Sequence, residues 1–375
     1  MTEARPILLA AGGTGGHLFP AEALARELIA RGLRPALVTD RRGAAFPPAL
    51  GTVETFRVRA GGVASGGTVR RIRGLLDIAV GTVEARALLR RMAPRAVVGF
   101  GGYASVPALF AAARIGVPTM IHEQNAVLGR ANRFLAPRAR RIATSFDSVA
   151  GIAPSDRHKV HRTGNPVRPE IAALAGRAYA VPASDGPRHL LVTGGSQGAS
   201  IFGRIVPPAI ALLSPALRAR LHVVQQCRAE DLDRVRDAYR ALGVDAELRT
   251  FFDDMPARLT WAHLAVCRAG ASTVAELTAV GMPAILVPYP HATDDHQTAN
   301  ARALEVSGGV WMIAEASFSP ERLATELAEK LDQPVMLGTA ALCLRAAGRP
   351  DAARVLADEV AALLRDSTAP REAAA

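Results

Sequence analysis

Three glycine-rich turns are the segments of this 375-residue chain whose composition most directly suggests chemistry. They are GGTGGH at 12–17, GFGGY at 99–103 and GGSQG at 194–198. Glycine lets a backbone approach a ligand closely, and the amides of such a turn and of the helix after it favour phosphate. A tight strand-to-helix turn can also need glycine for its shape alone. None of the three has the G-x-G-x-x-G spacing or a Gly-Lys-Ser/Thr ending, which disfavours NAD enzymes and ATPases.

A polar loop at 291–297, HATDDHQ, has the composition of a metal site. Its titratable residues are His291, Asp294, Asp295 and His296. Adjacent Asp and His residues more often form a hydrogen-bonded surface turn, so we expect no metal there. The three cysteines are Cys227, Cys267 and Cys343. They are far apart, with no second Cys or His at metal-ligand spacing, so we expect neither a zinc site nor a disulfide framework.

Apolar runs alternate with helical patterns, and this order predicts the elements that position the glycine turns. The expected strands lie at 6–11, 35–40, 96–102, 116–125, 188–193, 221–227, 264–270 and 283–290. The first helix is predicted from Pro20 to Gly32, with Pro20 in its first turn and Gly32 as a left-handed cap. We therefore expect an α/β fold with two tandem doubly wound, Rossmann-like domains facing across a ligand cleft.

The turn-rich segment at 161–170 is a natural linker between the two series of strands. We expect an N-terminal domain at 1–163 and a C-terminal domain at 164–348. A helix at 349–366 would pack back on the N-terminal domain, and residues 367–375 would form a tail.

The charge is distributed unevenly along the chain. The 45 basic and 34 acidic residues give a net charge of +11. Residues 1–165 hold 24 basic and 10 acidic residues, a net charge of +14, whereas the remainder carries −3. This asymmetry predicts an anionic partner for the first half: nucleic acid, a membrane surface or a phosphorylated substrate. An aromatic content of 5% and the lack of a nucleic-acid motif disfavour nucleic acid.

No segment predicts a membrane span or a signal peptide. The longest uncharged run, 96–113, contains Pro107 and several glycines, whereas a spanning helix needs about 20 apolar residues. The apolar run near the N-terminus is short and breaks into glycines, so we expect the chain to stay in the cytoplasm.

Seven motifs occur in the order found in one family: GGTGGH, GFGGYASVP, HEQNAVLGRAN, TGNPVR, GGSQGA, FFDDMPARLTWAHLAVCRAGASTVAEL and PHATDDHQTANA. On these motifs, which extend over almost the whole chain, the sequence resembles the MurG family of GT-B glycosyltransferases. The resemblance implies inverting transfer of N-acetylglucosamine from UDP-N-acetylglucosamine to the C4 hydroxyl of the N-acetylmuramyl unit of lipid I. The product, lipid II, serves peptidoglycan synthesis, cell shape and cell division. No cofactor or strict metal requirement is expected. The alternative is a UDP-N-acetylglucosamine 2-epimerase or a transferase with a different acceptor.

The resemblance implies a donor site in the second domain. The matching positions are Ser196, Phe252, Ala271, Ser272, Thr273, Val274, Ala275, Glu276 and Gln297. Ser196 and the helix start at Ala271 would bind the diphosphate, and the backbone at Phe252 would pair with uracil. Glu276 would bind the ribose, although Thr273 and Glu276 also have the spacing of a capping box. Gln297, with His296 beside it, would bind sugar hydroxyls.

On the acceptor side, the resemblance implies a base for the attacking hydroxyl. His17 is the candidate, because an ordinary pKa of about 6.5 suits proton abstraction near neutral pH. The alternative is that His17 only positions the acceptor or the diphosphate. Glu123 is a weaker candidate base and could instead orient its loop. Thr14, Gly15 and Gly16 would line the donor sugar and acceptor, Asn125 would bind the transferred sugar, and Arg168 would meet the diphosphate.

The segment at 57–91 mixes basic and apolar side chains. Its residues include Arg70, Arg71, Arg73, Leu75, Leu76 and Ile78. Such a mixture suits an anionic lipid surface. The family uses this region to reach a polyprenyl-linked acceptor, which implies a peripheral enzyme on the cytoplasmic face of the bacterial inner membrane. The alternative is a solvated helix whose leucines face its own core.

Overall fold

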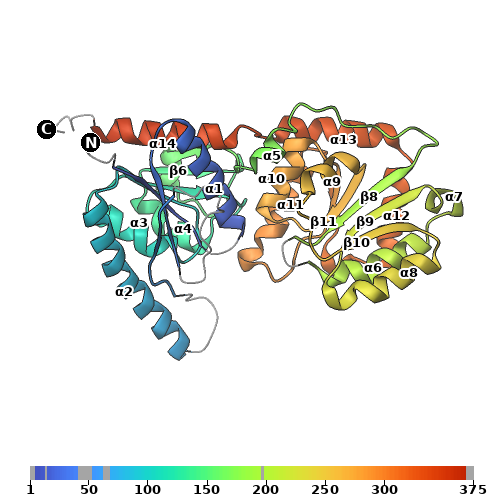
Figure 1. Cartoon of the computed structure of the whole chain (residues 1–375), viewed down its shortest axis with the longest axis horizontal. Helices are drawn as coiled ribbons and strands as arrows, with labels where there is room; N and C mark the ends of the chain where they lie inside the picture. The colour runs from blue at the N-terminus through green and yellow to red at the C-terminus, as the bar shows by residue number, and fades with distance from the viewer. Residues whose placement is uncertain (1–4, 13–14, 41–52, 62–67, 196–197, 369–375) are drawn as a thin grey trace. The chain divides into compact units, whose positions relative to one another are not determined.

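The computed structural model describes residues 5–12, 15–40, 53–61, 68–195 and 198–368, with only the backbone described at 68–72 and 367–368. The chain forms two compact units (Figure 1). The first contains residues 1–168 and 350–375, and the second contains residues 169–349. Each unit has its own parallel sheet, so the prediction of two doubly wound α/β domains is confirmed.

The first unit has a seven-stranded sheet with the order β3-β2-β1-β4-β5-β6-β7. Its strands are β1 (Ile7–Ala10), β2 (Pro35–Thr39), β3 (Thr55–Arg57), β4 (Ala96–Gly99), β5 (Thr119–Glu123), β6 (Arg141–Thr144) and β7 (Val160–Arg162). Its α-helices are α1 (Gly15–Ala30), α2 (Thr68–Met92), α3 (Ser105–Arg114), α4 (Arg130–Leu135) and α14 (Ala352–Thr368). All the strand pairs are parallel.

Both faces of this sheet are buried, as β1 shows. Ile7 and Leu9 pack in a core that includes residues of α1 and α14. Leu8 and Ala10 point the other way, into a core that includes residues of α2 and α3. Successive strand residues alternate between faces, so a strand covered on both sides is apolar throughout. Figure 1 shows α14 and α1 on one side of the sheet and α2 and α3 on the other.

Helix α14 follows the second unit in the chain but packs on the first. Its residues Leu356, Val360 and Leu363 lie fully buried in the core beside α1. Two ion pairs join it to β6, from Arg141 to Glu359 (2.5 Å) and to Asp366 (2.6 Å). The helix is therefore part of the first unit's core.

The second unit has a six-stranded parallel sheet with the order β10-β9-β8-β11-β12-β13. Its strands are β8 (Arg188–Thr193), β9 (Leu221–Gln226), β10 (Asp245–Arg249), β11 (Leu264–Cys267), β12 (Ala284–Leu286) and β13 (Val310–Met312). Its α-helices are α5 (Pro169–Ala172), α6 (Ser200–Ala211), α7 (Pro215–Arg218), α8 (Leu232–Ala241), α9 (Met255–Trp261), α10 (Ala271–Val280), α11 (His296–Glu305), α12 (Pro320–Leu331) and α13 (Pro334–Ala347). One side of the sheet packs in a core with residues of α6, α8 and α12.

The first helix differs from its predicted extent. It begins at Gly15, so Pro20 lies inside the helix and the prediction of Pro20 in the first turn is wrong. Glycine at two of the first helical positions hid this start, because glycine disfavours helix interiors. The cap is confirmed, since Gly32 has a left-handed φ of +71°. Among the described residues, no helix is long and apolar enough to cross a membrane.

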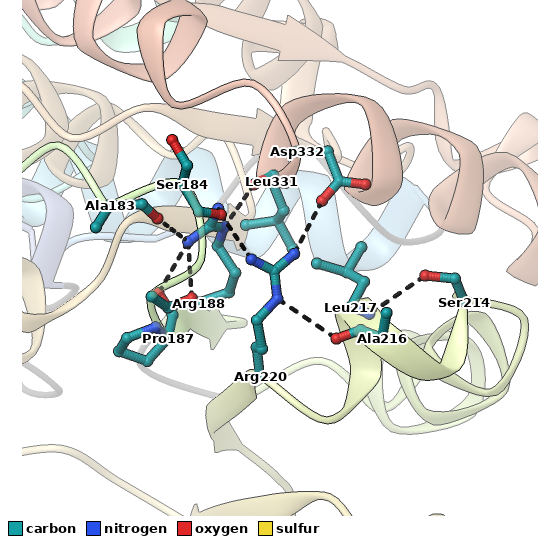
Figure 2. Close-up of polar contacts among 11 residues, drawn as sticks. Ala183, Ser184, Pro187, Arg188, Ser214, Ala216, Leu217, Arg220, Leu331 and Asp332 are labelled. Carbon is teal, nitrogen blue, oxygen red and sulfur yellow. Dashed lines mark hydrogen bonds and ion pairs between the residues drawn. The ribbon is translucent and has the colours of Figure 1, made fainter.

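Arg188, at the start of β8, holds the N-terminal edge of the second sheet. Its side chain is 1% exposed and donates to the carbonyl of Leu331, at the end of α12 (2.6 Å). It also donates to the carbonyls of Ala183 (2.8 Å) and Ser184 (2.8 Å) in the preceding loop. Figure 2 shows these carbonyl oxygens around the guanidinium. Burial lowers the pKa of Arg188, and the carbonyls replace the hydrogen bonds it would otherwise make with water.

We predict that Arg188→Met destabilises the second unit by about 3 kcal/mol or more, because several buried carbonyls lose their donor. The measurement is urea unfolding followed by circular dichroism. Arg220→Met is the matched control, since Arg220 donates to the Ser184 carbonyl (2.7 Å) from a more exposed position. It should cost about 1 kcal/mol or less. Equal losses for the two variants would contradict the assigned importance of burial.

Candidate functional site

The strand order reverses direction at one place in each sheet, between β1 and β4 in the first unit and between β8 and β11 in the second. Ligands of doubly wound folds bind outside the carboxyl ends of the strands at such switch points. The glycine turns predicted from the sequence follow β1, β4 and β8, at these points. Each unit therefore offers one candidate ligand site of its own.

His17 is a half-buried residue in the first turn of α1 and lies against the turn at 99–103. A Cβ atom at Gly101 would stand 3.2 Å from its Cε1, and one at Gly102 would stand 3.3 Å from its Cδ2. Both glycines also have left-handed φ angles, +87° and +72°. This turn thus needs glycine to make room for the imidazole, which is a reason the sequence did not reveal.

A chain of polar side chains begins at Nδ1 of the His17 ring. His17 Nδ1 lies 3.2 Å from Gln124 Oε1. Gln124 Nε2 lies 2.9 Å from His122 Nδ1, and His122 Nε2 lies 2.9 Å from the Gly164 carbonyl. Burial lowers the pKa of His122 to about 4, so His122 is neutral near pH 7.

Glu123, at the end of β5, orients its loop. Its buried carboxylate accepts hydrogen bonds from the Asn125 amide (3.0 Å), the Asn125 side chain (3.1 Å) and the Gly129 amide (2.9 Å). Asn132 Nδ2 adds a fourth at 2.8 Å. Both oxygens of this carboxylate are therefore occupied by donors at positions 125–132. The geometry favours the orienting role for Glu123 and turns the Nδ2 of Asn125 inward.

Arg168 is the other predicted site residue whose side chain the first unit describes. Its guanidinium carbon lies 5.9 Å from the centre of the Phe19 ring, on α1. Gly15 and Gly16 are the first residues of the same helix. Two of these predicted site residues therefore lie on α1, and the third, Arg168, contacts α1 through Phe19. Thr14 lies outside the described residues.

In the second unit, Gln226 at the end of β9 holds the glycine turn after β8. Its Oε1 accepts from Thr193 Oγ1 (3.0 Å) and the Gly194 amide (3.1 Å), and its Nε2 donates to the Thr250 carbonyl (3.1 Å). The Gly195 and Gly198 amides also donate within the turn. The amides of these three glycines therefore donate to acceptors within the second unit. Ser196 lies outside the described residues.

Helix α10 starts at the switch point, and the backbone amides of its first turn precede the first hydrogen bond within the helix. The first intrahelical bond runs from the Val274 amide to the Gly270 carbonyl (2.9 Å), and the N-cap Gly270 has no side chain to cap the turn. Thr273 and Glu276 lie inside the helix, so the capping-box interpretation of this pair is wrong. Ala271, Ser272 and Ala275 complete the predicted segment. The amides before Val274 and the helix dipole together suit an anion.

Gln297 joins the ends of two strands. Its Oε1 accepts from the Ala269 amide (3.2 Å), after β11, and from the Tyr289 amide (3.0 Å), after β12. This places Gln297 beside the start of α10. Because the oxygen is committed to the backbone, the amide nitrogen is the group that Gln297 can offer a ligand, as a donor.

Phe252 follows β10 with its ring 3% exposed and Arg258 above it at 5.3 Å. The segment 250–252 connects to the glycine turn through the Gln226 bond to Thr250. The ring is packed inside the second unit, and the main-chain role expected for Phe252 stays a prediction.

The polar loop predicted to be a surface turn bonds to itself. His296 Nδ1 donates to the Thr293 carbonyl (2.7 Å), and Thr298 Oγ1 donates to Asp295 (2.7 Å). Asp294 and Asp295 have left-handed φ angles of +53° and +50°. Across the described part of the chain, no group of three or more His, Cys, Asp or Glu side chains is placed to hold a metal ion.

Sequence analysis missed two supporting residues, Gln124 and Gln226. Gln124 stands in the quoted HEQN motif, and Gln226 is a polar residue at the end of an apolar strand. A Gln or Asn at the carboxyl end of an apolar strand is a signal for such a supporting residue, because a buried amide must have hydrogen-bond partners nearby.

The chain matches two family models and close relatives. The model for the glycosyltransferase family 28 N-terminal domain matches residues 7–144, and that for the C-terminal domain matches residues 189–356. A Rhodospirillum centenum protein is 58% identical over 95% of this chain and 93% of its own length. A Paramagnetospirillum magneticum protein is 54% identical over 97% and 98%. Both are named UDP-N-acetylglucosamine–N-acetylmuramyl-(pentapeptide) pyrophosphoryl-undecaprenol N-acetylglucosamine transferase.

Solved structures show the same fold. The crystal structure of Acinetobacter baumannii MurG has a TM-score of 0.78 and 27% identity, covering 96% of this chain and 99% of that one. A structure titled as a putative UDP-N-acetylglucosamine 2-epimerase from Listeria monocytogenes has a TM-score of 0.64 and 15% identity, covering 97% and 98%. At that identity, the second likeness concerns the fold alone.

We predict that Gly101→Ala displaces the His17 imidazole, because the new Cβ would press on Cε1. Gly116→Ala is the matched control: Gly116 also has a left-handed φ, +78°, but open space around its Cβ position. Both variants should lose about 1 kcal/mol of stability through backbone strain. Only Gly101→Ala should shift the His17 ring signals in an NMR spectrum. Shifts of similar size in both variants would contradict the steric argument.

Proposed function

The chain belongs to glycosyltransferase family 28, and from this we infer that it is a hexosyltransferase that converts lipid I to lipid II. It transfers N-acetylglucosamine from UDP-N-acetylglucosamine to the C4 hydroxyl of the N-acetylmuramyl unit, with inversion at the anomeric carbon. The observation that carries this conclusion is identity above 50%, over nearly the full length, to relatives named for this transfer. The reaction supplies peptidoglycan synthesis, on which cell shape and division depend.

For the donor, we propose that the start of α10 binds the diphosphate. The amides of Ala271, Ser272 and Thr273 precede the first intrahelical acceptor bond, and the positive helix end adds to their attraction for phosphate. Ser196 would add its hydroxyl. These groups stabilise the leaving UDP as negative charge develops on it.

The other donor groups are assigned by their chemistry. Glu276, one turn into α10, accepts from the ribose hydroxyls, and the backbone at Phe252 pairs with uracil. Gln297 donates from Nε2 to a sugar oxygen, since its Oε1 is committed to two backbone amides. Because only the Nε2 of Gln297 remains for the ligand, Gln297 recognises a hydrogen-bond acceptor on the sugar.

For the transfer step, we propose that His17 is the catalytic base. The acceptor oxygen forms a bond to the anomeric carbon, the bond from that carbon to the diphosphate breaks, and its electron pair leaves with UDP. The hydroxyl proton passes to His17. Gly15, Gly16 and Thr14 line the sugar and the acceptor, and Asn125, held by Glu123 through its Nδ2, offers its Oδ1 to the sugar. Arg168 contributes positive charge toward the diphosphate.

We also propose that α2 rests on an anionic membrane surface at the cytoplasmic face of the inner membrane. Leu75, Leu76 and Val83 are 57%, 60% and 70% exposed, and Arg73 is exposed beside them. The leucines thus do not face the unit's own core, whereas Ile78 packs against it. Exposed apolar side chains next to arginine suit the boundary between lipid headgroups and acyl chains. The side chains of Arg70 and Arg71 lie outside the described residues.

We predict acceptor-dependent transfer. Incubation with UDP-N-acetylglucosamine and a lipid I analogue should release UDP and give a disaccharide product, detected by mass spectrometry. Without acceptor, UDP release should fall to background. Isomerised sugar nucleotide in the acceptor-free reaction would instead identify an epimerase and contradict the proposed function.

We predict that two substitutions separate binding from chemistry. His17→Ala should lower kcat by about a hundredfold or more, with UDP affinity nearly unchanged, because it removes only a base. Glu276→Ala should mainly weaken donor binding, by about tenfold, through the loss of a ribose contact. Steady-state kinetics and UDP calorimetry measure both effects. Similar behaviour of the two variants would contradict the assignment of separate roles.

We predict that Leu75→Ser with Leu76→Ser lowers binding to vesicles containing anionic lipid by about tenfold or more, because about 2 kcal/mol of apolar burial is lost. Leu342→Ser is the control, since Leu342 is 67% exposed on α13. Sedimentation with vesicles measures binding. Unchanged binding of the double variant would contradict the use of α2 as the membrane contact.

A further inference from the structure

The polar chain beside His17 has defined directions of donation, because backbone carbonyls anchor it. The Gly164 carbonyl can only accept, so His122 Nε2, at 2.9 Å, carries a hydrogen. Neutral His122 then has its lone pair on Nδ1, which must accept from Gln124 Nε2 at 2.9 Å. Gln124 Nε2 also lies 2.9 Å from the His122 carbonyl, a second group that only accepts. The nitrogen of the Gln124 amide is therefore fixed on the His122 side.

The same amide must present its oxygen to His17. Gln124 Oε1 lies 3.2 Å from His17 Nδ1, and an amide oxygen accepts only. The hydrogen in this contact therefore belongs to Nδ1. A neutral imidazole carries one ring hydrogen, so Nε2 holds the basic lone pair.

We propose that Gln124, held by His122, is a positioning residue that keeps the hydrogen of neutral His17 on Nδ1 and makes Nε2 the nitrogen that takes the proton of the attacking hydroxyl. The catalytic part of this inference rests on the proposed role of His17 as the base. The tautomer part depends on the hydrogen-bond geometry alone. In the course of the transfer, His17 becomes an imidazolium whose Nδ1–H continues to donate to Gln124.

The surroundings keep this arrangement in place. Gln124 and His122 are each 2% exposed or less, so water does not compete for their hydrogen bonds. His122 also packs beside Phe100, with ring centres 5.6 Å apart. The titratable neighbours on β5 are His122, which burial keeps neutral near pH 7, and Glu123, whose carboxylate accepts from three donors of its loop and from Asn132 on α4. Neither is available to reverse the direction of the Gln124 amide.

The first test is the His17 tautomer, read by long-range ¹H–¹⁵N NMR on protein with ¹⁵N-labelled histidine at a pH where His17 is neutral. The wild-type protein should show the hydrogen on Nδ1. Gln124→Met, of similar size but without an acceptor, should raise the Nε2–H fraction. A wild-type His17 with its hydrogen on Nε2, or no change in Gln124→Met, would overturn the inference.

The second test is the pH profile of kcat/KM with the lipid I analogue. Gln124→Met should lower kcat by about tenfold to a hundredfold, with KM for UDP-N-acetylglucosamine within about twofold of wild type. Gln124→Glu keeps the accepting oxygen and should restore much of the rate. When ionised, it should also raise the pKa of His17 and move the low-pH limb upward by about one pH unit. Wild-type rates and profiles in both variants would overturn the positioning role.

Controls separate this inference from the proposed function. Gln225→Met removes another buried amide, which accepts from the Tyr239 hydroxyl (2.6 Å) in the second unit, and should leave the His17 tautomer and the rate unchanged. Thermal unfolding shows whether each Gln124 variant is folded. If His17→Ala were fully active, the proposed base would fail, while the NMR result would still decide whether Gln124 sets the tautomer.

Discussion

The requirement that every strand run parallel to its neighbours determines where chemistry can occur in this protein. Parallel strands with both faces covered are apolar along their length, as Ile7 to Ala10 and Leu190 to Val192 show. In such central strands, polar side chains lie at the strand ends and in the loops after them. Because all carboxyl ends lie at one edge of each sheet, the functional residues of each unit collect there without being adjacent in sequence.

Carboxamide side chains hold these edges together in both units. Gln124 joins β5 to the start of α1, Gln226 joins the ends of β8 and β9 to the segment after β10, and Gln297 joins the ends of β11 and β12. A carboxamide both donates and accepts without carrying charge. It can therefore fix loops around a charged substrate without competing with the substrate's own electrostatics.

Much of the fold could be predicted from local sequence. The apolar runs gave the order of the strands, and Gly32 marked the end of the first helix. The start of that helix could not be predicted, because Gly15 and Gly16 disfavour a helix that the tertiary structure nevertheless forms. The capping-box interpretation of Thr273 and Glu276 failed for a related reason: spacing alone does not show where a helix begins, and here it begins at Ala271.

The candidate site was predictable in its residue types but not in its hydrogen bonds. The glycines of the turn at 99–103 suggested a phosphate loop. In the structure they make room for the His17 ring, a contact between residues more than 80 positions apart. Likewise, the direction of the Gln124 amide depends on the Gly164 carbonyl, on a segment beyond β7. Such bonds are set by the packing of distant segments, so no local pattern contains them.

The path of α14 has a consequence for how the chain reaches its native state during synthesis. Leu356, Val360 and Leu363 complete the core of the first unit, yet they leave the ribosome after the entire second unit. The second unit has all of its residues available first and can fold while the first still lacks one of its helices. A nascent chain released too early would therefore expose the apolar surface of β4, β5 and β6 that α14 covers, a surface that chaperones and proteases recognise.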